Sequence, residues 1–559
     1  MRPAGGVSSA FDLERSHMHR KLWLSAVMAA LGALLLVVAG FASAASSSAA
    51  KKGGTLKLNM SATDVDFSDP SLAYGTISWQ IEYATGLKLL NYPDKAPPLG
   101  SRLQAEAAAG LPIVSNSGKT YTFTIKRGLR FSDGSAVTAK NFKWAFDRSA
   151  TKAQQSPATA FMDDVVGYTK AVDGNKNPAH VPGVIARGNK LIIKLTQPDG
   201  GLLAKLAMPF FQAISLKTKV DPHGVTAYPS AGPYYIASRV VNRHITLKRN
   251  KFYRGPRPHN IDTFDITVNT NLDQSLLQVK SNQIDYDMGG LPSTAHADLA
   301  KRYGLNKGQY QVHQLVETDY VALNTSRPTF ASAKLRKAAN FAIDRPAMLR
   351  VRGAFAGKRT DQILPPNMRG FEDAKIYPLK GADYKKAKSL AGSSCKGVTL
   401  YTATSPTGQN LAQVFKYNLS QIGCDVNVKS FVGFAIYTAA GTKGEPFDAA
   451  LVGWNQDYPD PYDFMNILLD GNNIHADNNN NLAYFNVGRV NKLLASANRL
   501  TGPARYKRYG SLDVTVSKNY APWASYDNRN MREFVSKRTG GYLFQPANAS
   551  ADLDTFFIK

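Results

Sequence analysis

The segment 395–431 constrains the fold most, because its apolar pattern changes twice. Val398 and Leu400 begin a short alternating run that predicts a strand. Apolar residues then recur at helical spacing, at Leu411, Val414, Phe415, Leu419 and Ile422. The run "DVNVKSF" after Cys424 alternates again, as a second strand does. A strand–helix–strand unit can place two parallel strands side by side, so the segment predicts the α/β class.

The N-terminal segment has the three-part pattern of a secretory signal peptide. His19, Arg20 and Lys21 precede an apolar stretch over residues 22–41, and the small residues 42–44 (Ala-Ser-Ala) follow. We expect residues 1–44 to be a signal peptide cleaved after Ala44, residues 45–52 to be a flexible linker, and the chain to be exported to the periplasm or cell surface. The alternative is an uncleaved anchor, because about 20 apolar residues can span a bilayer. No cysteine stands directly after the apolar stretch, so we expect no lipid attachment there.

Export would determine whether the two cysteines of the chain are oxidised or reduced. Cys395 and Cys424 stand just before the two predicted strands of the first segment, so they lie at the starts of neighbouring strands. In an oxidising compartment we expect a disulfide between them, worth about 2 to 4 kcal/mol. The alternative is a pair of buried free thiols.

Strand and helix signals divide the chain into two mixed regions. Before residue 320 most segments alternate, as at Tyr121, Phe123 and Ile125, and Thr138 is a candidate helix cap. After residue 320 helical spacing is more frequent, and Gly392 is placed to end one helix. The last segment is strand-like again. This order predicts two mixed lobes, of which the first is discontinuous.

The sequence gives no convincing signal for catalysis or for nucleic-acid binding. The 559-residue chain has a formal charge of +27, but its Lys and Arg are scattered, as on a solvated surface. It contains no G-x-S-x-G, no phosphate-binding G-x-x-x-x-G-K and, after the leader, no histidine pair at helical zinc spacing. We therefore expect no enzyme, no catalytic residue, no metal site, no cofactor and no nucleic-acid partner.

Seven stretches in order resemble one family. They are "GGTLKL", "YTFTIKRGLRFSDGSAVTAKNFKWAFDR", "SAGPY", "LKRNKFYRGPRPHNIDTFDI", "LNTSRPTFASAKLRKAANFAIDRPAM", "DYKKAKSLAG" and "GWNQDYPDP". Together they resemble the extracellular solute-binding proteins of family 5, which deliver oligopeptides, dipeptides and related solutes to ABC importers. Two departures are Ser230-Ala231 in place of the more usual Gly-Thr, and the lack of the lipid-bearing cysteine that many relatives have.

The resemblance implies a periplasmic-binding-protein-like fold, with two mixed α/β lobes joined by a hinge that close over the ligand. The implied organisation is lobe 1 over 53–320 with an extra subdomain over about 99–216, lobe 2 over 321–520, and a return to lobe 1 over 521–559. The hinge crossings are expected near 316–323 and 521–526.

The stretch "FDAALVGWNQDYPDP" carries the main candidate site. Residues 447–452 read as a buried strand that ends at Gly453 and Trp454, and ligands bind at carboxyl ends of strands in α/β sheets. In peptide-binding relatives the Asp three residues after the Trp binds the α-ammonium of the ligand, and Asp457 matches it. Trp454 offers a flat wall for cation–π or apolar contact. The alternatives are that Trp454 is core and that Asp457 caps the loop.

Other candidates rest on the resemblance alone. Tyr74, Gly75 and Thr76 match a loop that lines the cleft in relatives, although a plain helix entry also fits. Arg369 lies in a region near the cleft in relatives and suits a ligand carboxylate, although a surface arginine also fits. Asp460 and Asp463 are expected to be solvated or to cap the loop.

The sequence therefore predicts an exported binding protein of an ABC importer. Its expected partners are a peptide or related small solute and the permease subunits, and we expect a monomer that meets the membrane only through the permease or an uncleaved leader. A metal chelate, haem, an oligosaccharide or an opine are alternative solutes. An exported hydrolase, or a surface adhesin or regulatory receptor, are alternatives of other classes.

Overall fold

The structure is a computed structural model that describes residues 52–60, 64–97, 99–268, 271–392, 395 and 397–559. The predicted signal peptide and residues 45–51 of the predicted linker lie outside these residues. Residues 52–559 form one compact unit by their contacts. Within the described part of the chain, no helix combines the length and apolarity that crossing a bilayer requires.

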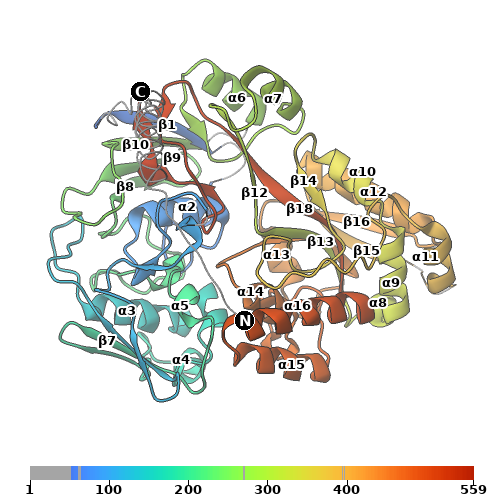
Figure 1. Cartoon of the computed structure of the whole chain (residues 1–559), viewed down its shortest axis with the longest axis horizontal. Helices are drawn as coiled ribbons and strands as arrows, with labels where there is room; N and C mark the ends of the chain where they lie inside the picture. The colour runs from blue at the N-terminus through green and yellow to red at the C-terminus, as the bar shows by residue number, and fades with distance from the viewer. Residues whose placement is uncertain (1–51, 61–63, 98, 269–270, 393–394, 396) are drawn as a thin grey trace, which may run out of the picture. The chain divides into compact units, whose positions relative to one another are not determined.

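A five-stranded sheet forms near the start of the described chain. Its first strand buries Leu56 and Leu58 and exposes Thr55 and Lys57, which follows from the alternation of the sequence. The order is β11-β1-β10-β9-β8, with β1 parallel to β10 and β11 and the others antiparallel (Figure 1). The strands are β1 (Thr55–Met60), β8 (Tyr234–Val240), β9 (His244–Arg249), β10 (Thr263–Val268) and β11 (Tyr286–Asp287), and helix α2 (Thr76–Thr85) packs on β8.

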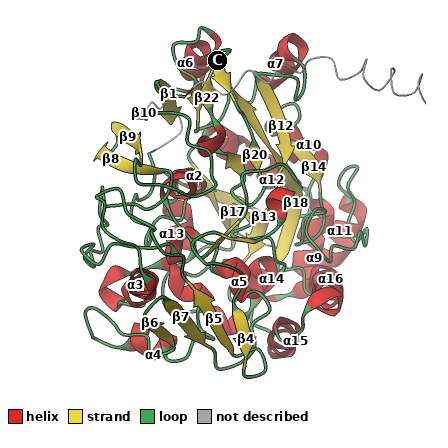
Figure 2. Cartoon of the chain, turned by 60° about the vertical axis from the view of Figure 1, so that its left-hand side comes forward, coloured by secondary structure: helices red, strands yellow, loops and turns green. Residues whose placement is uncertain are grey.

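A separate four-stranded antiparallel sheet lies within the range 99–216 predicted as an extra subdomain. Its order is β4-β5-β7-β6, and α3 packs on β6 and β7 (Figure 2). Thr138 is the N-cap of α3, as predicted, and its N–H donates to the side chain of Asn141 at 2.8 Å. The elements are β4 (Ile113–Ser115), β5 (Thr120–Thr124), α3 (Ala139–Ser149), α4 (Tyr168–Asp173), β6 (Val184–Arg187), β7 (Lys190–Lys194) and α5 (Leu202–Lys205).

A seven-stranded sheet forms the second large layer. Its order is β12-β18-β13-β17-β15-β16, with β14 beside β18. Strands β13 and β18, which contain the two predicted hinge crossings, pair antiparallel at its centre, and the long red β18 of Figure 1 continues alongside β12. The strands are β12 (Tyr310–Gln314), β13 (Glu317–Leu323), β14 (Gly357–Arg359), β15 (Val398–Ala403), β16 (Val426–Phe431), β17 (Ala449–Asn455) and β18 (Trp523–Phe534).

Helices surround this second sheet and connect the layers. Gly392 follows α11 with a φ of 57°, a left-handed conformation that favours glycine, and ends the helix as predicted. The remaining helices are α6 (Leu272–Lys280), α7 (His296–Tyr303), α8 (Pro328–Ala331), α9 (Ala333–Ala342), α10 (Arg345–Val351), α11 (Tyr384–Ala391), α12 (Pro406–Ser420), α13 (Ala435–Ala440), α14 (Tyr462–Leu469), α15 (Gly488–Asn498) and α16 (Gly502–Asn519). Short strand pairs are β2 (Leu90–Asn91) with β3 (Gln104–Ala105), β19 (Thr539–Gly540) with β22 (Phe557–Ile558), and β20 (Phe544–Gln545) with β21 (Ser550–Ala551).

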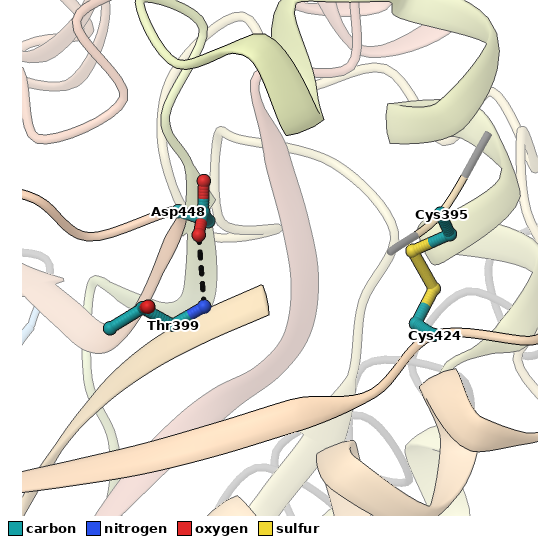
Figure 3. The surroundings of a disulfide bond; sticks show 4 residues. All are labelled: Cys395, Thr399, Cys424 and Asp448. Atoms are coloured by element: carbon teal, nitrogen blue, oxygen red, sulfur yellow. Dashed lines mark hydrogen bonds between the residues drawn. A yellow bond between two sulfur atoms is a disulfide. The ribbon is translucent and has the colours of Figure 1, made fainter. Parts of the chain in front are cut away.

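The predicted strand–helix–strand unit is β15, α12 and β16. The two strands are parallel neighbours, as the spacing predicted, and Val398 pairs with Val426. Cys395 and Cys424 precede them and are joined by a disulfide, with Cα atoms 4.9 Å apart (Figure 3). Both cysteines are buried in a core that includes Leu411, Phe415 and Leu419. The bond closes the loop that holds α12.

Loss of this disulfide is expected to destabilise the protein. Because the bond closes a loop of 29 residues, the double change Cys395→Ser/Cys424→Ser should lower the free energy of unfolding by about 2 to 4 kcal/mol. The measurement is chemical denaturation with and without reductant. The native protein should lose stability in reductant, whereas the double variant should not respond, and an equal response of both proteins would contradict the prediction.

Candidate functional site

The loop that carries Asp457 leaves the carboxyl end of β17. This strand lies between β13 and β15, and residues 449–452 are buried. It runs through Asn455, so the expected strand end at Gly453 and Trp454 was too early. Its antiparallel pairing with β13 continues as far as Glu317 opposite Asn455, which explains the extra length. The loop ends at Pro461, the N-cap of α14.

The carboxylate of Asp457 is buried and bonded to a residue distant in sequence. Only 7% of Asp457 is exposed, and its Oδ2 accepts a hydrogen bond from the hydroxyl of Tyr74 at 2.7 Å. Burial raises the pKa of Asp457 to about 7, although the hydrogen bonds from Tyr74 and Asp463 lower it in part. Among the described residues, the Asp457 carboxylate accepts no backbone N–H of its own loop, so the alternative of a loop cap does not describe it. Its carboxylate instead meets a side chain of the first region.

Asp463 is the residue that holds the loop. It is fully buried in α14, and its Oδ2 accepts hydrogen bonds from the Asp457 N–H at 2.9 Å and from the Trp454 indole at 3.1 Å. Of the two expected alternatives for Asp463, solvated or capping, the structure shows the capping one. Burial and the neighbouring Asp457 raise the pKa of Asp463 well above its usual range. One carboxylate thus fixes both the indole and the backbone of the loop.

Asp460 is also buried, so it follows the capping alternative and not the solvated one. It is 5% exposed, and its Oδ1 lies 2.7 Å from Nη2 of Arg505. The same Oδ1 accepts the backbone N–H of Tyr462 at 2.9 Å, so the expected capping is confirmed. Arg505 belongs to α16 and also donates to the carbonyl of Asn498 at 2.9 Å. A buried cation therefore ties the loop to the helical layer.

Aromatic rings enclose the Tyr74–Asp457 contact. The ring of Tyr74 lies 5.5 Å from Phe210, 5.7 Å from Trp79 and 6.3 Å from both Phe161 and Trp454. Trp454 is 9% exposed and belongs to the core cluster, so it both packs and faces Tyr74. We call Asp457, Asp463, Tyr74 and Trp454 the Asp457 site. It combines a buried carboxylate with flat apolar walls, which suits a cation.

Gly75 and Thr76 contribute to the structure of the loop that precedes α2 more than to the Asp457 site. The N–H groups of Tyr74 and Gly75 both donate to Oδ2 of Asp66 at 2.8 Å, and Asp66 also accepts from Ser78 in the first turn of α2. Thr76 is exposed at the start of α2. Asp66 therefore holds Tyr74 in place, and its role was not expected from the sequence. The pattern D-x₇-Y-G is too general to have indicated it.

Arg369 is exposed and is not brought to Asp457. Its guanidinium lies 5.5 Å from the centre of the Tyr506 ring on α16. Its contact with that ring agrees with the alternative of a surface arginine. The structure thus groups Asp457, Trp454 and Tyr74 and leaves Arg369 apart from them.

A comparison with family models decides the family. Residues 102–476 match the model of the bacterial extracellular solute-binding proteins, family 5. The chain belongs to this family. Members of family 5 are solute-binding proteins, and the seven stretches of sequence had indicated this family.

Individual relatives agree with this assignment. Oligopeptide-binding protein OppA of Bacillus subtilis is 24% identical, with 82% of this chain and 86% of OppA covered. Heme-binding protein A of Haemophilus influenzae is 26% identical, with 78% and 80% covered. The solved structure of clavulanic acid biosynthesis oligopeptide binding protein 2 shares the fold with a TM-score of 0.82 at 21% identity, covering 91% of this chain and 96% of that one. The predicted periplasmic-binding-protein-like fold is confirmed.

Proposed function

We propose that this family 5 protein is the exported substrate-binding protein of an ABC importer and captures peptide-like solutes through their α-ammonium group. The observation that carries the proposal is the Asp457 carboxylate, buried at the carboxyl end of β17 and bonded to Tyr74 from the first region. A relative named as oligopeptide-binding supports a peptide over other solutes.

The chemistry of binding follows from what the carboxylate contacts. The Tyr74 hydroxyl, a neutral donor, is a side-chain partner of Asp457 Oδ2. An ammonium group offers a charge-assisted hydrogen bond, which is about twice as strong as a neutral one. Trp454 and the rings around Tyr74 exclude water and lower the local dielectric, so the ion pair gains more than it would at an exposed site. The ligand's cation would therefore replace or join the tyrosine hydroxyl.

Lobe closure would deliver the solute. We propose lobe 1 over 53–320 and 521–559 and lobe 2 over 321–520, with β13 and β18 as the hinge strands. Tyr74 then belongs to lobe 1 and Asp457 to lobe 2, so their hydrogen bond is a contact of the closed state. A ligand drives closure only if it binds the closed state better than the open one, and an ion pair at this contact does so. The closed protein would then hand its solute to the membrane permease as a monomer.

The test begins with the solute that the protein carries. Native mass spectrometry of the protein purified from its own cells weighs the bound molecule, which we expect to be a peptide. The identified peptide is then synthesised with a free and with an acetylated amino terminus, and both are titrated by calorimetry. We expect the acetylated form to bind at least about 30-fold more weakly, as the loss of about 2 kcal/mol requires. Equal affinity of the two forms would refute ammonium recognition.

Affinity for the free peptide should depend on pH. Because burial raises the pKa of Asp457 to about 7, the unliganded site carries a proton at lower pH that ammonium binding must release. Affinity should therefore fall below about pH 7, by up to about tenfold per unit. By the same linkage, the folded state binds more protons than the unfolded state between about pH 4 and 7, so this group's contribution to stability decreases as pH rises through that window. Calorimetry at several pH values measures the first effect, with the acetylated peptide as control, and a flat profile would contradict it.

Haem is the second candidate solute, because one relative is named as a heme-binding protein. A haem ligand brings carboxylates rather than an ammonium, so it would not need the Asp457 charge. Mass spectrometry separates the two solutes, since haem has a characteristic mass and absorbance.

Export also remains part of the proposal. It comprises the signal peptide, its cleavage after Ala44 and the periplasmic or cell-surface location, and N-terminal sequencing of the secreted protein tests it.

A further inference from the structure

Three aspartates from distant segments meet away from the Asp457 site. Asp94 follows β2, whereas Asp552 and Asp554 lie near the C-terminus between β21 and β22. One carboxylate oxygen from each lies within 4.8 Å of the others. Asp94 is half-buried, and Asp552 and Asp554 are only 5% and 1% exposed. We call these three residues the aspartate triad.

Each member of the triad keeps one buried oxygen that no donor outside the triad reaches among the described residues, while the carboxyls of Asp94 and Asp552 are hydrogen-bonded to each other. These atoms are Asp94 Oδ2, Asp552 Oδ2 and Asp554 Oδ1. The opposite oxygens of the two buried members are occupied: Asp552 Oδ1 accepts the N–H of Asp554 at 3.1 Å, and Asp554 Oδ2 lies 3.3 Å from Arg257. A buried carboxylate oxygen without a partner is costly. The unpartnered oxygens therefore point to a cation or donor that binds them.

When all of the carboxyls around the triad are ionised, the neighbouring basic groups among the described residues do not balance their charge. Glu106 adds a fourth buried carboxylate and pairs with Arg257, its Oε1 lying 2.9 Å from Nε. The second basic side chain is Lys88, whose buried ammonium lies 3.5 Å over the Tyr83 ring and has no hydrogen-bond acceptor in the described part of the chain. Four carboxyl groups thus face two basic groups. A divalent cation would supply the two missing positive charges.

We propose that the aspartate triad binds one hard divalent cation, with Ca²⁺ as the best fit. The available ligands are carboxylate oxygens, which hard cations prefer over nitrogen or sulfur sites. Ca²⁺ accepts irregular geometry and fills its coordination with water, whereas Mg²⁺ demands a near-ideal octahedron. The ion joins the segment after β2 to the C-terminal segment, and this inference does not depend on the proposed solute.

The experiment is calcium titration of the purified chain after removal of metal with a chelator. We expect calorimetry to give one Ca²⁺ per chain. In differential scanning calorimetry, addition of about 5 mM Ca²⁺ should raise the Tm by about 1 to 2 °C for a protein of this size, if the affinity is in the range of about 0.1 to 1 mM found for extracellular sites. Mg²⁺ should raise it less, and NaCl of equal ionic strength should not raise it. Absence of calcium uptake by the native chain would overturn the proposal.

Two variants test whether the aspartate triad is the calcium-binding site. Asp94→Asn and, independently, Asp552→Asn should weaken calcium binding at least tenfold, whereas Asp477→Asn, which makes the same change at an exposed position, should not. Wild-type calcium affinity in a folded Asp94→Asn or Asp552→Asn variant would overturn the proposal. If a shared proton or water fills the triad instead, the native chain will show no Ca²⁺-specific shift, which also overturns it.

Discussion

Asp457→Asn is expected to weaken binding of a peptide with a free amino terminus by about 30-fold to several thousand-fold, corresponding to about 2 to 5 kcal/mol. The change removes the charge that pairs with the ammonium but keeps an oxygen that can accept the Tyr74 hydroxyl. The unliganded protein should therefore fold as before, and its thermal stability near pH 8 should not fall, because a buried carboxylate with a pKa of about 7 is ionised there at a cost. Calorimetric titration and scanning calorimetry measure the two effects.

The matched control for this variant is Asp477→Asn. It removes one negative charge from an exposed residue of the same region, so it corrects for any general effect of charge on a basic protein. Its peptide affinity should equal that of the native protein. If Asp457→Asn and Asp477→Asn bind the peptide equally well, Asp457 does not recognise the ammonium.

Arg505→Met is expected to lower the free energy of unfolding by about 3 to 5 kcal/mol, because it leaves the buried Asp460 carboxylate without its cation. The carbonyl of Asn498 also loses a donor. Since Asp460 lies in the loop that follows Asp457, the variant should weaken peptide binding as well as stability. Thermal and urea unfolding measure the first effect, and calorimetric titration measures the second.

Two comparisons interpret the Arg505 result. Adding Asp460→Leu to Arg505→Met should restore much of the lost stability, because the unpaired charge is then removed. Arg302→Met breaks an exposed pair with Asp298 and should cost far less, because solvent screens that pair. A double variant as unstable as Arg505→Met alone would show that packing, not charge, explains the loss.

The fold could be predicted where a pattern is local. The alternation around Val398 and the helical spacing from Leu411 predicted β15, α12 and β16, and Thr138 and Gly392 marked the ends of two helices. The end of β17 could not be placed, because its length is set by pairing with β13, more than a hundred residues earlier in the chain. The prolines after Asp457 indicated a loop but not where the strand before it stops.

The site could be predicted only in part for a similar reason. Motif resemblance singled out Asp457, Trp454 and Tyr74, which the structure brings together, yet it gave no reason to expect the direct bond between Tyr74 and Asp457. Asp463 was expected to be solvated or to cap the loop, and nothing in the sequence indicated that it would bond the Trp454 indole. Its burial follows from tertiary packing of α14, which no local pattern reports.

The disulfide and the Asp457 loop lie at opposite ends of one pair of parallel strands, β15 and β17. Cys395 precedes β15, whereas the loop follows β17, and these strands run in the same direction. Reduction of the disulfide is therefore expected to lower the stability of the protein without changing the geometry of the Asp457 site. A reporter dye attached near the sulfur pair could follow unfolding while ligand binding is measured at the other end of the strands.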